Sequence, residues 1–372
     1  MEAPHLASAE YWESTEIDLR LNPRLVYEAD GLLQFLREEV GIEGAVVMAT
    51  SGSSGTPKFA ILPKAALLAS AASVSKYLQL SRSDSWLAGL SDYHVGGLGI
   101  YARAFVTGAS VTTFNNTPWQ RDGKLFVKAL RESGARWSSL TPTHLFDLVE
   151  SEVPAPEAMR GLLLGGGRID VDLVRRASAL GWPVHSSYGM TEACSQIATG
   201  GVGETEWLPL LPEWETKLAF DQRLMIRGKA LFAGYATRGE TGWRFDPARD
   251  GDGWFLTGDC AEISEGCVRH QGRADDLVKV LGELVSLSVV ESAVSEVLGR
   301  LSAVLAFTDA RRGHEFLAVV EGTESAHYYQ QMLNASLTGL HRVSRVEVLR
   351  ELPRTDIGKI DRSALRRFLS QP

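Results

Sequence analysis

Residues 45–62 read AVVMATSGSSGTPKFAIL, in which a loop rich in glycine and hydroxyl groups lies between two apolar runs. Glycines let the backbone approach an anion closely and turn its N–H groups toward it. The hydroxyl groups add further donors, and Lys58 adds a positive charge. This stretch therefore predicts a phosphate-binding loop that follows a strand.

Two other interpretations of the loop are weaker. A flexible Ser/Gly linker would lack the apolar runs on both sides. A nucleotide-binding P-loop needs a longer spacing between its glycines and a Gly-Lys-Ser/Thr sequence at the start of a helix. Here only Ser53 and Ser54 separate the glycines, and Pro57 precedes the lysine. The predicted loop therefore belongs to another class of phosphate site.

The composition is typical of a globular protein and argues against two classes of partner. The chain has 372 residues, of which 44% are apolar and 23% charged, and its net charge is −8. Because the only dense basic run is 362–367, we expect no nucleic acid as main partner. The apolar stretches are too short for a membrane span, and the N-terminus lacks the features of a signal peptide. These features predict a cytoplasmic protein without membrane insertion, whose cysteines, Cys194, Cys260 and Cys267, are reduced packing residues.

Short β-type runs alternate with helical patterns from residue 45 to about residue 200, which predicts an α/β domain with mixed and parallel layered sheets. The expected strands are 45–49, 86–90, 110–114, 137–140, 162–164 and 184–187. The expected helices are 63–78, 97–107, 123–133, 143–151 and 171–180. Glycine, tryptophan and short β segments then predict a β-rich subdomain over 201–272.

The pattern changes again after residue 274, to that of a small α+β domain. We expect a hairpin over 277–286, strands over 303–308, 316–321 and 345–349, and helices over 287–298, 325–340 and 361–369. Asp361 is placed to cap the last helix. The sequence thus predicts a large domain over 1–274 and a small domain over 275–372, with the boundary at Asp275.

Polar motifs recur in order along the chain, although each alone also fits an ordinary turn or a solvated loop. Together they resemble the adenylate-forming superfamily of acyl- and aryl-CoA ligases, firefly luciferase and peptide-synthetase adenylation domains, over residues 45–370. The matching segments are 50–58, 94–97 (HVGG), 165–167 (GGG), 188–192 (YGMTE), 231–235 (LFAGY), 257–259 (TGD), 272–276 (GRADD) with Lys279 and 282–283, and 353–359 with 361–362. Segments 94–97 and 190–197 are most similar to o-succinylbenzoate–CoA ligases.

The resemblance implies a nucleotide site. The β- and γ-phosphates of ATP would be held by the loop residues Thr50, Ser51, Gly52, Ser53, Ser54, Gly55, Thr56 and Lys58. The adenine would be lined by Gly165, Gly166, Gly167 and Tyr188, and the ribose hydroxyls would be bound by Asp259 and Arg273.

The resemblance also implies catalytic residues. Thr191 would contact the α-phosphate, Glu192 would bind Mg²⁺, and Lys359 would be the adenylation lysine. Asp275 would be the interdomain hinge.

On the side of the acid, the resemblance places His94 near the reacting carboxylate, with Ser195 as a second substrate residue. Arg168, just after the glycine turn, is a candidate partner for a second carboxylate of the substrate. An exposed arginine at a helix start is the equal alternative for Arg168.

The implied activity is that of an ATP-dependent acid–thiol ligase, which forms an acyl-AMP and transfers the acyl group to CoA. The implied acid is o-succinylbenzoate or another aromatic acid, which would place the enzyme in menaquinone biosynthesis, with ATP, Mg²⁺ and CoA as cofactors and co-substrates and a homodimer as one candidate assembly. Two alternatives stay open: an acyl-AMP synthetase that loads a carrier protein, and a catalytically inactive nucleotide-binding homologue. Intact Lys359, Glu192 and Asp259 favour an active enzyme.

Three features depart from the family pattern. The phosphate loop starts early in the chain, so the chain is N-terminally shortened and part of the first sheet is expected to be absent or rebuilt. Phe59 stands where the family usually has glycine, and Leu287 where it usually has proline. Residues 208–212 (LPLLP) lack the glycines expected near the adenine.

Overall fold

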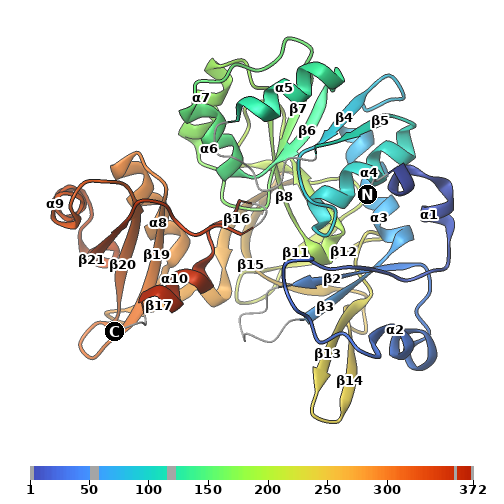
Figure 1. Ribbon diagram of the computed structural model, residues 1–372. Coiled ribbons are helices and arrows are strands. Elements are labelled where there is room, and N and C mark those ends of the chain that lie inside the picture. The colour runs from blue at the N-terminus through green and yellow to red at the C-terminus, as the bar shows by residue number, and fades with distance from the viewer. Residues whose placement is uncertain (1–3, 51–57, 115–122, 356–357, 370–372) are drawn as a thin grey trace. The chain divides into compact units, whose positions relative to one another are not determined.

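The computed structural model describes residues 4–50, 58–114, 123–355 and 358–369 (Figure 1). The chain divides into two compact units. The N-terminal unit comprises Met1–Ala219, Met225–Thr257 and Ile263–Arg269, and the C-terminal unit comprises Phe220–Leu224, Gly258–Glu262 and His270–Pro372. The expected domain boundary at Asp275 stays a prediction.

A six-stranded sheet forms the centre of the N-terminal unit, in the order β5-β4-β6-β7-β8-β9. The strands are β4 (Ser85–Ala88), β5 (Ser110–Thr113), β6 (Trp137–Leu140), β7 (Gly161–Leu164), β8 (Val184–Met190) and β9 (Ser195–Thr199). All neighbouring pairs are parallel except β8 and β9. The expected α/β class is confirmed, and the carboxyl ends of the five parallel strands share one edge.

Helices cover both faces of this sheet (Figure 1). They are α3 (Lys64–Tyr77), α4 (Val95–Thr107), α5 (Lys124–Ser133), α6 (Pro142–Glu150) and α7 (Val171–Ala179). On one face, Phe126 of α5, Leu145 of α6 and Val174 of α7 share a core with Leu87 and Leu162 of the strands. On the other, α3 packs against α4, and both contact β9.

Local sequence explains where these helices begin. Asp170 accepts a hydrogen bond from the Leu173 N–H at 3.0 Å and so caps α7. Thr141 caps α6 in the same way, and Pro142 at the first helical position needs no N–H partner.

A second sheet of the N-terminal unit has the order β1-β2-β3-β13-β14. Its strands are β1 (Asp18–Arg20), β2 (Ala45–Thr50), β3 (Lys58–Pro63), β13 (Gly234–Gly239) and β14 (Gly242–Pro247). Before β2 the chain forms the short helices η1 (Pro4–Ala7), α1 (Ala9–Glu13), α2 (Leu32–Phe35) and η2 (Leu36–Val40). The sequence pattern predicts no element before residue 45, because these elements are too short to show a period.

The β-rich stretch 201–272 does not form one sheet. Its strands β10 (Leu208–Pro209), β11 (Glu215–Leu218), β12 (Arg223–Arg227), β15 (Phe255–Ser264) and β16 (Cys267–Arg273) form a sheet in the order β10-β16-β15-β12-β11. Strands β13 and β14 lie in the same stretch but extend the β2-β3 sheet, where β13 pairs with β3. The β-rich character expected for 201–272 is confirmed, and its bounds as a subdomain stay a prediction.

The C-terminal unit is the expected α+β arrangement. Its elements are η4 (Ala274–Asp276), β17 (Leu277–Val280), β18 (Glu283–Ser286), α8 (Leu287–Leu298), β19 (Ser302–Asp309), β20 (Gly313–Glu321), α9 (Ala326–Ser336), η5 (Gly339–His341), β21 (Val343–Leu349) and α10 (Arg362–Leu369). Asp361 caps the last helix, since its Oδ1 accepts from the Ala364 N–H at 2.9 Å. The helix expected over 325–340 ends at Ser336, because Leu337 takes an extended backbone.

Among the residues that the structure describes, no helix combines the length and the apolar character needed to cross a bilayer.

Close packing between the neighbouring strands β6 and β7 gives a test of the fold. An added Cβ at Gly161, at the start of β7, would lie 2.0 Å from the Trp137 ring, whereas at Gly251 it would meet no heavy atom within 4 Å. We expect Gly161→Ala to lower the free energy of unfolding by about 1–3 kcal/mol through overpacking. Urea unfolding of Gly161→Ala and of the control variant Gly251→Ala measures this difference. Equal free energies of unfolding would show that the Trp137 ring moves aside without loss of stability.

Candidate active site

The predicted phosphate loop lies between the paired ends of β2 and β3. Thr50 pairs with Lys58 in the antiparallel register, and the Thr50 hydroxyl donates to the Lys58 carbonyl at 3.2 Å. The loop residues Ser51, Gly52, Ser53, Ser54, Gly55 and Thr56 lie outside the described residues. Their role therefore stays a prediction.

Tyr235 joins the end of this loop to the predicted metal ligand. The ammonium of Lys58 lies 5.5 Å from the centroid of the Tyr235 ring, and the Tyr235 hydroxyl donates to Oε1 of Glu192. Strand β13 fixes Tyr235 opposite Ala60 of β3, and the Phe232 N–H donates to the Glu192 carbonyl at 2.9 Å. Segments far apart in the sequence thus bring a lysine to the face of one phenol ring and a carboxylate to its hydroxyl.

Glu192 fits a magnesium ion that arrives with a nucleotide. The described residues contain no group of three or more His, Cys, Asp or Glu that would cage a metal. Mg²⁺ is usually held by one or two carboxylates together with substrate phosphates and water. A single carboxylate near the predicted phosphate loop suits that mode of binding.

A tight reversal between β8 and β9 carries Thr191 and Glu192. Both lie in the 3₁₀ turn η3 (Thr191–Ala193), after which Cys194 has φ 49° and Ser195 φ 135°. An added Cβ at Gly189 would lie 1.8 Å from the Ser195 carbonyl, so this register requires glycine. Cys194 is buried, which raises the pKa of its thiol and suits the expected packing role.

The predicted adenine residues follow neighbouring parallel strands. Gly165 comes directly after β7, and an added Cβ there would lie 2.6 Å from the Ser187 hydroxyl of β8. Gly166 has φ 79°, which favours glycine. Gly167 completes the turn, and Tyr188 lies at the end of β8. These residues share the carboxyl edge of the sheet, and their contact with adenine stays a prediction.

His94 lies at the same edge, between β4 and α4. It is the N-cap residue of α4, and its N–H donates to the Ser91 carbonyl at 3.1 Å. An added Cβ at Gly97 would lie 2.1 Å from that carbonyl. The turn before the helix is therefore packed directly onto the first helical turn. This packing fixes the backbone position from which the His94 side chain extends.

Arg103 is a functional candidate that the sequence interpretation missed. It lies in α4 and is 1% exposed, and within the described residues no carboxylate pairs with it. Burial without a counter-charge lowers the pKa of Arg103 to about 9, so the side chain is still a cation at pH 7. Its one clear signal in the sequence is a charged residue within the apolar run 98–106 (LGIYARAFV).

The guanidinium of Arg103 is held by neutral groups. Nη2 donates to the Ser139 hydroxyl at 3.3 Å, and the guanidinium lies 4.8 Å from the centre of the Trp86 ring. Nε has no hydrogen-bond partner among the residues that the structure describes. An added Cβ at Gly99 would lie 3.1 Å from Nη1 of Arg103 and 3.5 Å from the Ser195 hydroxyl. Nη1 of Arg103 and the hydroxyl of the predicted substrate residue Ser195 therefore both lie beside Gly99.

Arg168 lies in a different environment. It is exposed, in the segment between the glycine turn and α7. Its proposed role toward a second carboxylate stays a prediction, and burial makes Arg103 the stronger candidate for that role.

The predicted ribose residues and the predicted hinge residue meet within the C-terminal unit. Arg273 Nη1 lies 3.4 Å from Asp259 Oδ1, while its Nε and Nη2 donate to the two carboxylate oxygens of Asp275 at 2.8 and 3.2 Å. The hydrogen bonds with Asp275 are the main cause that raises the pKa of Arg273. His270, not singled out from the sequence, lies with Nε2 3.7 Å from Asp259 Oδ2.

Lys359 is more buried than a solvated loop lysine. Burial lowers the pKa of its ammonium, and its backbone N–H donates to the Thr355 hydroxyl at 3.2 Å. It precedes the capped helix α10, which holds the loop at its far end.

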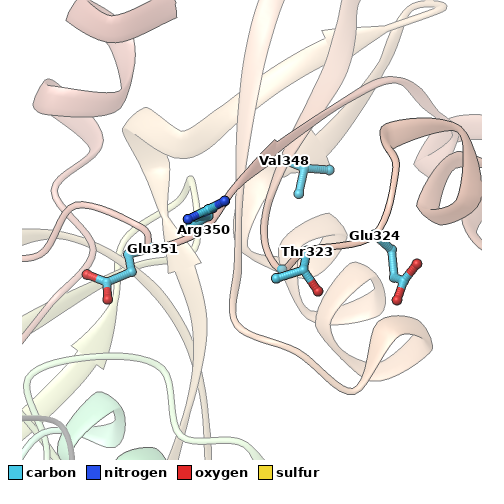
Figure 2. A pocket seen from close by; sticks show the side chains of 6 residues that line it. Thr323, Glu324, Val348, Arg350 and Glu351 are labelled. Atoms are coloured by element: carbon cyan, nitrogen blue, oxygen red, sulfur yellow. The ribbon is translucent and has the colours of Figure 1, made fainter.

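A surface hollow of about 510 Å³ also lies in the C-terminal unit (Figure 2). Figure 2 shows Thr323 and Glu324 on one side and Arg350 and Glu351 on the other. It includes none of the predicted site residues.

Comparison with known proteins identifies the family of the chain. A family model described as an AMP-binding enzyme matches residues 36–235, more than half of the chain. The chain is 31% identical over 279 residues to a 2-succinylbenzoate–CoA ligase of Salmonella typhimurium, covering 74% of this chain and 58% of that protein's length. It is 30% identical over 360 residues to a probable 2-succinylbenzoate–CoA ligase of Mycobacterium tuberculosis, covering 92% and 90%.

A solved structure is similar over most of the chain. It is the o-succinylbenzoate coenzyme A synthetase (MenE) of Bacillus subtilis in complex with ATP and magnesium ion, with a TM-score of 0.72 and 25% identity, covering 86% of this chain and 69% of that one. The resemblance that the motifs predict is thereby confirmed. The chain belongs to the AMP-binding enzyme family.

Proposed function

We propose that this protein is an ATP-dependent acid–thiol ligase that activates an aromatic acid of the o-succinylbenzoate type as acyl-AMP and transfers it to CoA. The relatives named above support the reaction class. The observation that carries the choice of acid is the buried cation of Arg103, which pairs with no carboxylate in the described part of the chain. A role in menaquinone biosynthesis follows from that acid, while a cytoplasmic location and a homodimer stay predictions.

The reaction has two steps. An oxygen of the substrate carboxylate attacks the α-phosphorus of ATP, and pyrophosphate leaves. The sulfur of CoA then attacks the acyl carbon, AMP leaves, and the thiol proton is lost. The first step brings negative groups together, so the residues around it must supply positive charge and aligned donors.

Each predicted residue has a place in the first step. Thr191 and the loop that ends at Lys58 would orient the triphosphate, and the Lys359 ammonium would offset charge as the carboxylate attacks. Mg²⁺, held by Glu192, would supply positive charge beside the phosphates when bound. His94 would lie beside the attacking carboxylate.

A second carboxylate on the acid explains Arg103. Burying a guanidinium without a counter-ion is costly, and an anionic ligand would remove much of that cost. Monocarboxylic aromatic acids would leave Arg103 unpaired, so a dicarboxylic acid is the better substrate. The Ser139 hydroxyl accepts from Nη2 of Arg103, and the Ser195 hydroxyl lies beside Gly99 of the same helix.

Asp275 is proposed as the hinge because Arg273 ties it to Asp259. A ribose at Asp259 and Arg273 would compete with the Asp275 carboxylate for the same donors. Nucleotide turnover would thus alter the contacts of the hinge residue.

The substrate assignment is tested by pyrophosphate release over a panel of aromatic mono- and dicarboxylic acids, with and without CoA. We expect o-succinylbenzoate to exceed benzoate, and Arg103→Met to reduce kcat/KM for the dicarboxylic acid by roughly 10²-fold, since truncating one partner of a buried charge pair costs 2–5 kcal/mol. Arg103→Lys, which keeps the charge, should lose less. Turnover without CoA-dependent AMP release would favour a carrier-protein acceptor, and no turnover would favour the inactive homologue.

The metal assignment is tested with Glu192→Gln, which removes the negative charge and keeps the side-chain volume. We expect the midpoint of the Mg²⁺ titration of acyl-AMP formation to rise at least about tenfold. Calorimetric binding of ATP with and without Mg²⁺ gives a readout independent of turnover. Glu240→Gln, an exposed residue of the β13-β14 turn, is the control. An unchanged Mg²⁺ titration would remove Glu192 from the metal site.

The role of Lys359 is tested by measuring the two half-reactions separately. Lys359→Ala should slow acyl-AMP formation by roughly 10²–10³-fold, as for loss of a positioned donor. CoA attack on supplied acyl-AMP should stay within a few-fold of wild type, because that step does not need the ammonium. Arg345→Gln removes an exposed charge from the same unit and serves as control. A folded, fully active alanine variant would exclude Lys359 from the mechanism.

A further inference from the structure

The first elements of the chain pack against the helix that follows His94. Trp12 of α1 stacks on Phe105 of α4 with ring centroids 6.3 Å apart, and η1 also contacts α4 (Figure 1). Trp12 is 3% exposed, and its indole N–H donates to the Leu6 carbonyl at 2.8 Å. Elements η1 and α1 therefore pack against α4.

The segment ends in an ordered charge cluster on β1. β1 pairs in parallel with β2, which sets Arg20 opposite Met48. Nε of Arg20 donates to Asp18 Oδ2 at 2.6 Å, and the Tyr11 hydroxyl donates to the same oxygen at 2.7 Å. Two donors from different elements thus orient the Asp18 carboxylate, which in turn orients the guanidinium.

The other edge of the guanidinium reaches the turn that carries His94. Nη1 of Arg20 donates to Asp92 Oδ2 at 2.6 Å, across 72 positions of sequence. The side chains of Arg20 and Asp92 are 20% and 31% exposed, so this ion pair is largely shielded from solvent. Charge-assisted hydrogen bonds of this geometry are among the stronger polar contacts in proteins.

Asp92 lies inside the turn that positions His94. The His94 N–H closes the turn on the Ser91 carbonyl, and the turn is packed onto Gly97. The position of the Asp92 side chain therefore affects the position of the N-cap of α4 and of the His94 imidazole.

We propose that Arg20 is a positioning residue for the acid substrate, which acts by holding Asp92 and thereby the turn that ends at His94. This inference rests on the proposed function, in which His94 lies beside the attacking carboxylate. The acid site is thus completed by β1, which lies before the phosphate loop in the sequence. The contact joins β1 of one sheet to the turn that follows β4 of another sheet of the N-terminal unit.

The test compares Arg20→Gln, Asp92→Asn and the double variant. Each single variant should raise KM for the acid at least about fivefold and leave KM for ATP within about twofold, because a small misplacement of one substrate affects that substrate first. The double variant should be no worse than the poorer single variant, since both remove one contact. Arg20→Lys has one ammonium group to serve two carboxylates. Its KM for the acid should lie between those of wild type and Arg20→Gln. Equal effects on both KM values, or additive losses, would indicate a merely structural role.

Arg244→Gln is the matched control. Arg244 pairs with Asp246 at 2.8 Å on β14, at the opposite edge of the sheet that contains β1, and it is exposed. It should leave both KM values unchanged. An equal loss in this variant would also contradict the proposal.

Hydrogen exchange separates failure of this inference from failure of the proposed function. Backbone amides of 89–98 should exchange faster in Arg20→Gln and Asp92→Asn than in wild type or Arg244→Gln. Unchanged exchange overturns the inference, whatever the activity. Faster exchange in a protein whose wild type activates no acid would uphold the coupling and reject the proposed function.

Discussion

The parallel pairing of β5, β4, β6, β7 and β8 is the constraint on which the candidate site depends. Parallel strands place all their carboxyl ends at one edge of the sheet, so the loops that follow them must meet there. The turn before His94, the glycine turn at 165–167 and the turn η3 after β8 are three such connections. The residues that bind one ligand can therefore be separated widely in sequence and still converge.

Lys58, at the start of β3, and Arg103, in α4, are two cations in different environments. Lys58 is exposed and lies over the Tyr235 ring, so its charge is largely solvated. Arg103 is buried among Ser139, Trp86 and Gly99, and no carboxylate of the described residues balances it. A solvated cation attracts many anions, whereas a buried cation is stabilised only by an anion that comes into contact with it. The first property suits a phosphate chain and the second suits selection of a particular acid.

How far the sequence predicts this protein depends on how local each signal is. The strands 137–140 and 184–187 and the helix 287–298 were predictable, because their apolar patterns are continuous and turn residues bound them. Arg103 was missed because an arginine in an apolar helix reveals its role only when burial and the absence of a counter-charge are known. The Arg20–Asp92 contact was missed because it joins a strand to a turn 72 positions away through side chains alone. The predicted ligand contacts themselves stay predictions.

The departure at Phe59 shows how a change beside the loop is absorbed by the core. Lys58 is exposed and Phe59 is 2% exposed, because neighbouring residues of β3 face opposite sides of the sheet. The Phe59 ring packs edge-on against Trp243 of β14 and Tyr27 of the early segment, at 5.5 and 6.2 Å between ring centroids. The Trp243 indole N–H also donates to the Asp30 carbonyl at 2.9 Å. A bulky residue at this position therefore fills the space between the early segment and the β13-β14 hairpin. It lies on the opposite face of β3 from Lys58 and leaves the side of Lys58 open to a phosphate.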